Sequence, residues 1–257
     1  MNIFLLALIV IIAHFTVFFI IGQLLKNNSV VDIGWGLGFV VLVVVGLLTQ
    51  SGANILALVI SIFVSIWGLR LTYYIAKRNY KKPEDFRYQN MRKKWGNKVA
   101  INAFFKVYML QALIMYIVAM PILVAFNGGT NEYNIIVSLG VLVWLIGFIF
   151  ESVSDAQLRK FVKNNKNKGK IIKSGLWRYT RHPNYFGEAT MWWGLFLIAL
   201  PSELGLLAVV SPLLITYLLL YVSGVPMLEK KYENNEEFQE YKKTTSKFFP
   251  LPPKKNN

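Results

Sequence analysis

The chain has 257 residues, of which 55% are hydrophobic and only 16% charged, and it contains no cysteine. A soluble domain of this length would need more polar surface, and the lack of cysteine excludes disulfides, thiol catalysis and cysteine metal sites. The net charge of +15 lies in loops beside long apolar segments, where it serves membrane topology and anionic lipid headgroups rather than nucleic acid.

Long apolar segments recur along the whole chain, and a membrane span needs about 20 such residues. They predict one all-α, polytopic membrane domain over residues 1–257 with about seven transmembrane helices. The segments are 2–25, 33–50, 53–76, 101–126, 134–158, 185–200 and 203–225. The first is too long for a signal-peptide core and is expected to be retained as a helix.

The lysines and arginines indicate the orientation of these helices. Nearly all of them lie in the segments 77–98 and 159–181, in the short loop after the first helix, and in the tail that begins at Glu229. Such loops stay on the cytoplasmic side of a membrane, which predicts an outside N-terminus and an inside C-terminus.

The second apolar segment opens with polar and small residues. Asp32 and Trp35 stand at its start, followed by alternating glycines from Gly34 to Gly38. These glycines precede an apolar helix instead of following a strand, so helix packing through small residues is favoured over a nucleotide loop. The third segment carries Trp67, Arg70 and Tyr74 near its inner end; Arg70 can also simply extend to the interface.

Ionisable residues at membrane depth are costly and mark candidate sites. Glu151, Asp155 and Arg159 follow one another at intervals of four residues and therefore share one helical face. A ladder of interfacial salt bridges is the alternative. The loop that follows contains Lys168, Gly169 and Lys170, which suit a phosphate site or a solvated basic loop equally.

The block from Tyr179 to Glu188 is the sharpest polar feature. Pro183 suits the first turn of a helix, and a helix start favours phosphate, to which Arg181 and His182 add charge or hydrogen bonds. Asn184 and Glu188 are one turn apart. The other histidine, His14, is expected to be packed, and two histidines do not provide a catalytic zinc site, so no metal is predicted.

Residues 174–188 read SGLWRYTRHPNYFGE and closely resemble a signature of the steroid 5-alpha-reductase superfamily, in particular its bacterial branch of uncharacterised membrane proteins. The resemblance includes residues 67–70, 84–95, 151–158 and 223–229 and covers most of the chain from about residue 30. Sterol reductases and isoprenylcysteine carboxyl methyltransferases share similar pieces of the RHPNY core.

The resemblance implies a seven-helix fold in a bacterial cytoplasmic membrane that binds NADPH and delivers hydride to an enone-type double bond. Carried over by motif, cofactor-binding residues would include Asn184 and Glu188 at the nicotinamide end and Glu151 and Asp155 near the adenosine. The remaining members of this cofactor set would be Arg70, Arg159, Lys168, Lys170, Tyr179, Arg181, His182, Glu229 and Tyr232.

At the reacting carbonyl the steroid enzymes carry a Gln-Glu pair in helix two and a tyrosine in helix three. Here the corresponding catalytic candidates are Asp32, Trp35, Trp67 and Tyr74. The resemblance implies a steroid-like or other lipophilic substrate. Two rivals remain: an S-adenosylmethionine-dependent methyltransferase of a lipid or prenyl group, and a non-catalytic lipid-binding membrane protein. The basic residues of 159–181 favour NADPH, which carries several phosphates, over S-adenosylmethionine, which carries none.

Overall fold

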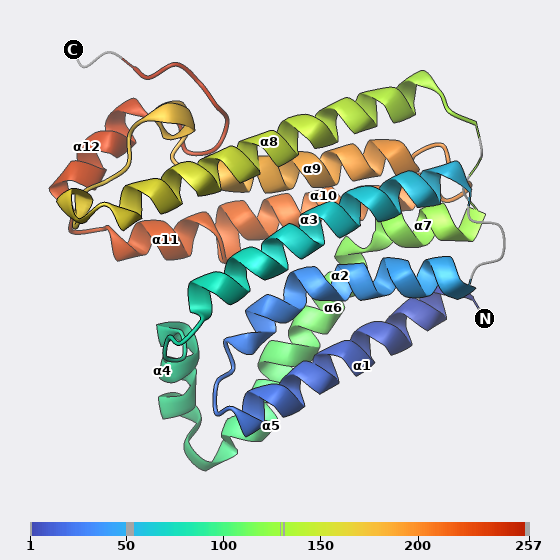
Figure 1. The fold of residues 1–257 in the computed structure, drawn as a ribbon, viewed down its shortest axis with the longest axis horizontal. Coiled ribbons are helices and arrows are strands. Elements are labelled where there is room, and N and C mark those ends of the chain that lie inside the picture. The colour runs from blue at the N-terminus through green and yellow to red at the C-terminus, as the bar shows by residue number, and fades with distance from the viewer. Residues whose placement is uncertain (1, 50–53, 129, 131, 255–257) are drawn as a thin grey trace. The chain divides into compact units, whose positions relative to one another are not determined.

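The computed structural model describes residues 2–49, 54–128, 130 and 132–254. Within these residues the chain is almost entirely helical and forms no strand, apart from one isolated bridge between Thr180 and Ser246 (Figure 1). Six helical stretches are long and apolar enough to cross a membrane. The predicted all-α, polytopic membrane fold is confirmed. The predicted segment ends at residues 50 and 53 lie outside the described part.

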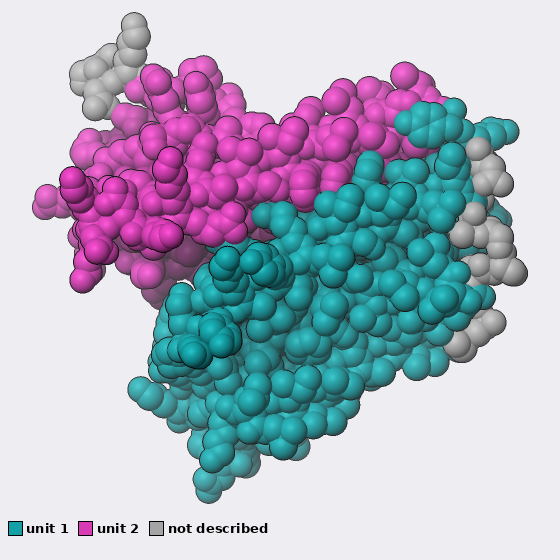
Figure 2. All heavy atoms as spheres, viewed as in Figure 1, with its two compact units in different colours: residues 1–133, 199–208 teal, residues 134–198, 209–257 magenta. Residues whose placement is uncertain are grey.

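The chain divides into two compact units, shown in Figure 2. Unit 1 comprises residues 1–133 and 199–208, and unit 2 comprises residues 134–198 and 209–257. The expectation of one domain stays a prediction.

Unit 1 begins with three long apolar helices: α1 (Ile3–Leu24), α2 (Val30–Thr49) and α3 (Ile55–Asn79). Asparagines start two of them, since Asn2 and Asn54 accept hydrogen bonds from backbone N–H groups of the first turn. The shorter elements are α4 (Phe86–Trp95), η1 (Gly96–Lys98), α5 (Val99–Ala103), η2 (Phe104–Met109), α6 (Leu110–Val118), α7 (Met120–Gly128) and most of η5 (Gly205–Val209).

The predicted fourth span, 101–126, is not one continuous helix. It contains the π-helix η2, and it breaks between Val118 and Met120, because Pro121 cannot donate a backbone hydrogen bond. The segment 77–98, expected to be a basic loop, contains α4, whose Asp85 accepts from the N–H of Arg87.

Helices α2 and α3 touch through glycines. A Cβ atom on Gly36 would lie 2.6 Å from the carbonyl oxygen of Gly68, and one on Gly68 would lie 2.7 Å from that of Gly36. Any side chain at either position would force the backbones apart. The interpretation of the glycines in 34–38 as a helix-packing element is therefore confirmed.

Unit 2 contains α8 (Ile135–Lys163), which Asn134 caps, and α9 (Pro183–Ala199), which Pro183 starts as predicted. The other elements are η3 (Asn165–Asn167), η4 (Gly175–Arg178), α10 (Val210–Tyr217), η6 (Leu218–Val222), α11 (Val225–Lys231) and α12 (Glu236–Thr244). At 1.5 Å per residue, the 17 residues of α9 reach only about 26 Å, slightly short of a hydrocarbon core. The number of spans thus stays a prediction.

Helices α8 and α9 lie side by side in Figure 1 and also meet through glycines. A Cβ atom on Gly147 would lie 2.6 Å from the carbonyl oxygen of Gly187, and one on Gly194 would lie 2.8 Å from that of Gly140. This close approach fixes the start of α9, and with it the RHPNY block, against the part of α8 that carries Glu151.

Replacing Gly147 with alanine should destabilise the protein, because the new methyl group must push α9 away. Overpacking of this kind costs about 1–3 kcal/mol, which lowers the thermal midpoint of the detergent-purified protein by about 2–10 °C. The matched control is Ile146→Ala, which truncates a neighbouring side chain that is 41% exposed. Equal midpoints for the two variants would contradict the glycine contact.

Candidate cofactor-binding site

Arg181 lies buried just before the start of α9. Its Nε donates to Oε1 of Glu229 at 2.9 Å, and its Nη1 donates to the carbonyl oxygen of Thr245 at 2.7 Å. A second Nη1 bond reaches the carbonyl of Lys242 at 3.3 Å, and the backbone N–H of Arg181 donates to Ser246 at 2.9 Å. One arginine thus ties the start of α9 to α11 and to the end of α12.

Glu229 on α11 is shared by three basic side chains. Besides Arg181, His182 Nε2 lies 3.1 Å from Oε1, and Lys242 Nζ lies 3.2 Å from Oε2. A partly buried carboxylate is tolerated when cations and hydrogen bonds compensate its lost hydration. These four residues are called the Glu229 cluster below.

His182 presents a polar atom without a partner. Burial lowers its pKa, against the opposing effect of the hydrogen bond to Glu229. In the neutral ring Nε2–H donates to Glu229, which leaves Nδ1 as an acceptor. This Nδ1 is buried and has no hydrogen-bond partner among the described residues, while Tyr185 stacks on the ring at 5.6 Å between centroids. A ligand with a hydrogen-bond donor would satisfy it.

Tyr241 and Trp177 connect the same region to α8. The Tyr241 hydroxyl donates to the backbone carbonyl of Trp177 and, at 3.3 Å, to that of Thr180. Trp177 Nε1 donates in turn to the carbonyl of Ser154 on α8 at 3.2 Å. Burial raises the pKa of Tyr241, so its phenol stays a donor.

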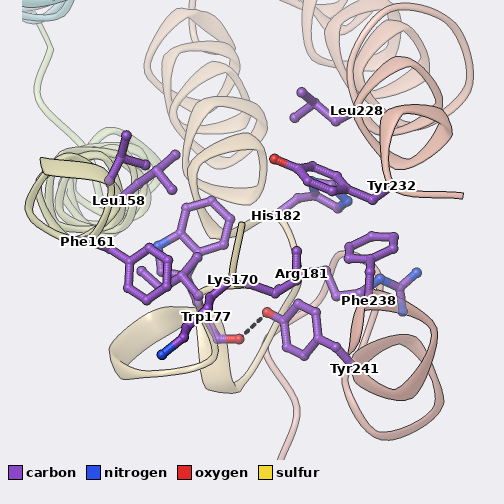
Figure 3. Close-up of a pocket in the computed structure, with 13 residues that line it drawn as sticks. Leu158, Phe161, Lys170, Trp177, Arg181, His182, Leu228, Tyr232, Phe238 and Tyr241 are labelled. Atoms are coloured by element: carbon purple, nitrogen blue, oxygen red, sulfur yellow. Dashed lines mark hydrogen bonds between the residues drawn. The ribbon is translucent and has the colours of Figure 1, made fainter. Parts of the chain in front are cut away.

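A cavity of about 160 Å³ lies among these residues (Figure 3). Its walls are mostly aliphatic and aromatic, with three basic side chains among them. The lining residues are Leu158, Phe161, Val162, Lys170, Ile171, Ile172, Trp177, Arg181, His182, Leu228, Tyr232, Phe238 and Tyr241. An apolar cavity with a few placed polar groups is the usual form of a small-molecule site.

The structure gathers part of the predicted cofactor set in this place. Lys170, Arg181, His182 and Tyr232 line the cavity, and Glu229 bonds to two of them. Other members of that set lie outside the lining, including Arg159, Lys168 and Tyr179, which are exposed.

The remaining predicted members lie on the two helices that meet through glycines. Glu151 and Asp155 are buried on α8, whereas Arg159, one turn further, is exposed. Asn184 and Glu188 are half-buried in the first turns of α9, and Asn184 Oδ1 is a buried acceptor without a partner among the described residues.

The predicted catalytic residues and Arg70 belong to unit 1. Asp32 accepts from Arg87 Nη2 at 2.9 Å and from the Tyr88 hydroxyl at 2.7 Å, so it links α2 to α4. Trp35, Phe39 and Trp67 form an edge-to-face series with centroids 5.5 and 5.6 Å apart. Arg70 and Tyr74 are half-buried on α3. The catalytic role of this set stays a prediction.

Sequence reasoning missed Trp177, Phe238 and Tyr241 as parts of the site. The spacing of Phe238 and Tyr241, three residues apart in a charged tail, is a signal for a helix with one apolar face. In the part of the chain that the structure describes, no group of His, Asp and Glu side chains could hold a metal ion.

The family model described as "Protein of unknown function (DUF1295)" matches residues 18–245. The chain belongs to this family. An uncharacterised protein of Schizosaccharomyces pombe is 26% identical over 220 residues, which cover 72% of this chain and 63% of that protein.

Two further relatives of this DUF1295 chain carry names that describe an activity. A 3-oxo-5-alpha-steroid 4-dehydrogenase 1 of Rattus norvegicus is 29% identical over 114 residues, 44% of this chain and 40% of the relative. A probable O-methyltransferase of Ustilaginoidea virens is 36% identical over 58 residues, 23% of this chain and 20% of the relative. The predicted resemblance to the steroid 5-alpha-reductase superfamily is confirmed.

The chain spans less than two thirds of the length of each of these curated relatives. No solved structure gives a significant match.

Tyr241→Phe should destabilise the protein without changing its shape, because the carbonyls of Trp177 and Thr180 lose their shared donor. Leaving buried acceptors unsatisfied costs about 1–3 kcal/mol. The matched control is Tyr232→Phe, whose hydroxyl makes no hydrogen bond among the described residues. Thermal midpoints in detergent measure both. If the midpoint of Tyr232→Phe fell as far as that of Tyr241→Phe, the attachment of α12 to the rest of unit 2 would not depend on the hydrogen bonds of Tyr241.

Proposed function

We propose that this chain is an NADPH-dependent membrane reductase of an activated carbon–carbon double bond in a lipophilic substrate, acting in a bacterial cytoplasmic membrane. Its similarity to 3-oxo-5-alpha-steroid 4-dehydrogenase 1 supports the reaction class. The observation that carries the proposal is the apolar cavity lined by Lys170 and by His182, whose Nδ1 is buried without a hydrogen-bond partner among the described residues. Such an atom calls for a ligand.

The residues present fit one part of a dinucleotide. A volume of about 160 Å³ takes a flat ring but not a complete cofactor, since pockets for drug-sized ligands hold about 300–1,000 Å³. Trp177, Phe238 and Tyr241 offer faces for ring stacking. Lys170 supplies a cation for a phosphate attached to that ring.

The proposal divides the work among the residues of unit 2. Arg181 is committed to Glu229 and to two tail carbonyls, so it positions the cavity wall. Phosphates would be held by Lys170 and by the exposed group of Arg159, Lys168 and Tyr179. Asn184 and Glu188 would face the nicotinamide end, and Glu151 and Asp155 the adenosine. When bound, NADPH supplies hydride, and the chain orients it and excludes water.

The substrate end is proposed to involve Asp32, Trp35, Trp67 and Tyr74 of unit 1, while Arg70 stays in the proposed cofactor set. Asp32 already accepts two hydrogen bonds, from Arg87 and Tyr88. It would therefore fix the direction of the Tyr88 phenol rather than transfer a proton itself. Tyr74 supplies a further hydroxyl that could polarise a carbonyl oxygen.

A second candidate is an S-adenosylmethionine-dependent methyltransferase, favoured by the match to a probable O-methyltransferase. Its adenine would suit the same aromatic walls. The two candidates differ in charge, because NADPH carries several phosphates and S-adenosylmethionine none.

Nucleotide affinity separates the candidates. Purified protein in nanodiscs should bind NADPH more tightly than NADH in calorimetric titrations, because the 2′-phosphate meets fixed positive charge. Lys170→Ala should narrow this preference by about tenfold, the value of one charged hydrogen bond. Lys166→Ala is the matched control, since Lys166 is exposed on the same loop, does not line the cavity and has no proposed phosphate contact.

Rising salt should weaken the preference for NADPH over NADH, because the loop faces water and dissolved ions screen its charges. Equal affinities for NADPH and NADH would remove Lys170 from the site. Binding of S-adenosylmethionine without either nucleotide would replace the reductase proposal with the methyltransferase.

A further inference from the structure

The segment after α12, residues 246–254, carries two apolar side chains that stay more than half exposed among the described residues. Phe249 is 64% exposed and Leu251 is 55% exposed. They lie in a non-helical stretch, which we call the C-terminal strap, that follows a highly charged helix. Apolar exposure is expected on a membrane-spanning helix but needs a partner here.

Two contacts place the strap at the ends of membrane helices of unit 2. Lys247 Nζ lies 5.5 Å from the ring centroid of Tyr221, in the π-helix η6 at the end of an apolar span. The ring of Phe249 lies 6.2 Å from that of Phe186, in the first turn of α9. The ends of spans are the level of lipid headgroups, where aromatic and basic side chains gather.

The charge of the strap is positive. From residue 241 to residue 254 the sequence has four lysines and no acidic residue. Lys242 and Lys243 are paired with Glu229 and Glu240, so Lys247 and Lys254 set the charge of the strap itself. A lysine near an anionic leaflet favours binding by about fivefold.

An open hollow of about 480 Å³ borders the strap at Pro253. Its other walls include Lys173, Arg178 and the hydroxyl-bearing residues Ser174, Thr244 and Thr245. Lys173 is neutralised by Glu237 at 3.0 Å, which leaves Arg178 as the cation of the hollow. Hydroxyl groups and an arginine are the donors that suit a phosphate.

We propose that the C-terminal strap docks on a leaflet of anionic phospholipid. Phe249 and Leu251 enter the boundary between headgroups and acyl chains, Lys247 and Lys254 face lipid phosphates, and one headgroup occupies the hollow beside Arg178. The partner is a lipid surface because aromatic, aliphatic and basic side chains stand together at the ends of spans.

The strap is also hydrogen-bonded to Arg181 of the Glu229 cluster and to Tyr179, two residues before it. Ser246 accepts from the backbone N–H of Arg181 at 2.9 Å, and the N–H of Leu251 donates to the carbonyl of Tyr179 at 3.0 Å. Docking on lipid therefore holds the wall of the cavity in place. This inference stands whether the cavity binds NADPH, another ligand or none.

The absence of native cysteine allows a direct test on the full chain. Phe249→Cys, labelled with an environment-sensitive nitrobenzoxadiazole probe, is reconstituted in phosphatidylcholine vesicles with and without phosphatidylglycerol. Spin-labelled lipid should quench this probe strongly. The matched control is Asn234→Cys, an exposed polar position between α11 and α12 that should remain unquenched. Leu251→Cys provides a second strap position if the first variant folds poorly.

The lysines supply the second arm of the experiment. In vesicles with phosphatidylglycerol, Lys247→Gln should lower the equilibrium constant for docking of the strap by about fivefold. In neutral lipid the same substitution should leave this constant unchanged. Quenching at position 249 or 251 no greater than at 234 would overturn the proposal. So would a probe signal that depends on protein concentration instead of lipid, which would assign the strap to a second copy of the chain.

Discussion

The carboxylate of Glu229 is the constraint on which the rest of unit 2 depends. This partly buried charge needs compensation, and Arg181, His182 and Lys242 provide it from α12 and from the residues just before α9. Removing one partner of a buried ion pair costs about 3–5 kcal/mol. The start of α9, the short helix α11 and the C-terminal helix are therefore fixed together, although about 60 residues separate Arg181 from Lys242.

This constraint builds the cavity. Because Arg181 also binds the carbonyls of Lys242 and Thr245, α12 cannot leave without exposing a buried guanidinium. Tyr241 and Phe238 consequently become walls of the cavity. His182, held by Glu229 through Nε2, keeps Nδ1 as a buried acceptor, so the same carboxylate supports the fold and orients a side chain of the proposed site.

Much of this architecture follows from local pattern. The spans are predicted by their apolar length, the start of α9 by Pro183, and the glycine contact of α2 by the small residues of 34–38, whereas the glycine contact between α8 and α9 was not predicted. Arg181 and His182 were predicted from their place at a helix start and from the motif, and Glu229 from the motif alone. The attachment of the tail to Arg181 was not, because α12 reads as a solvated charged segment. The pairing of Asp32 with Arg87 and Tyr88 also could not be predicted from the local sequence. The spacing of residues predicts which side chains are neighbours on one helix, but not which residue about 55 positions away becomes a partner.

Hydrogen–deuterium exchange of the full chain in nanodiscs tests most directly whether the Glu229 cluster holds the nucleotide. With NADPH bound, residues 177–182 and 238–246 should gain protection together, because both segments form the wall of one cavity. Glu229→Gln should remove that gain in both segments while α1 to α3 exchange as before. Protection elsewhere, with these two segments unchanged by saturating NADPH, would contradict the account.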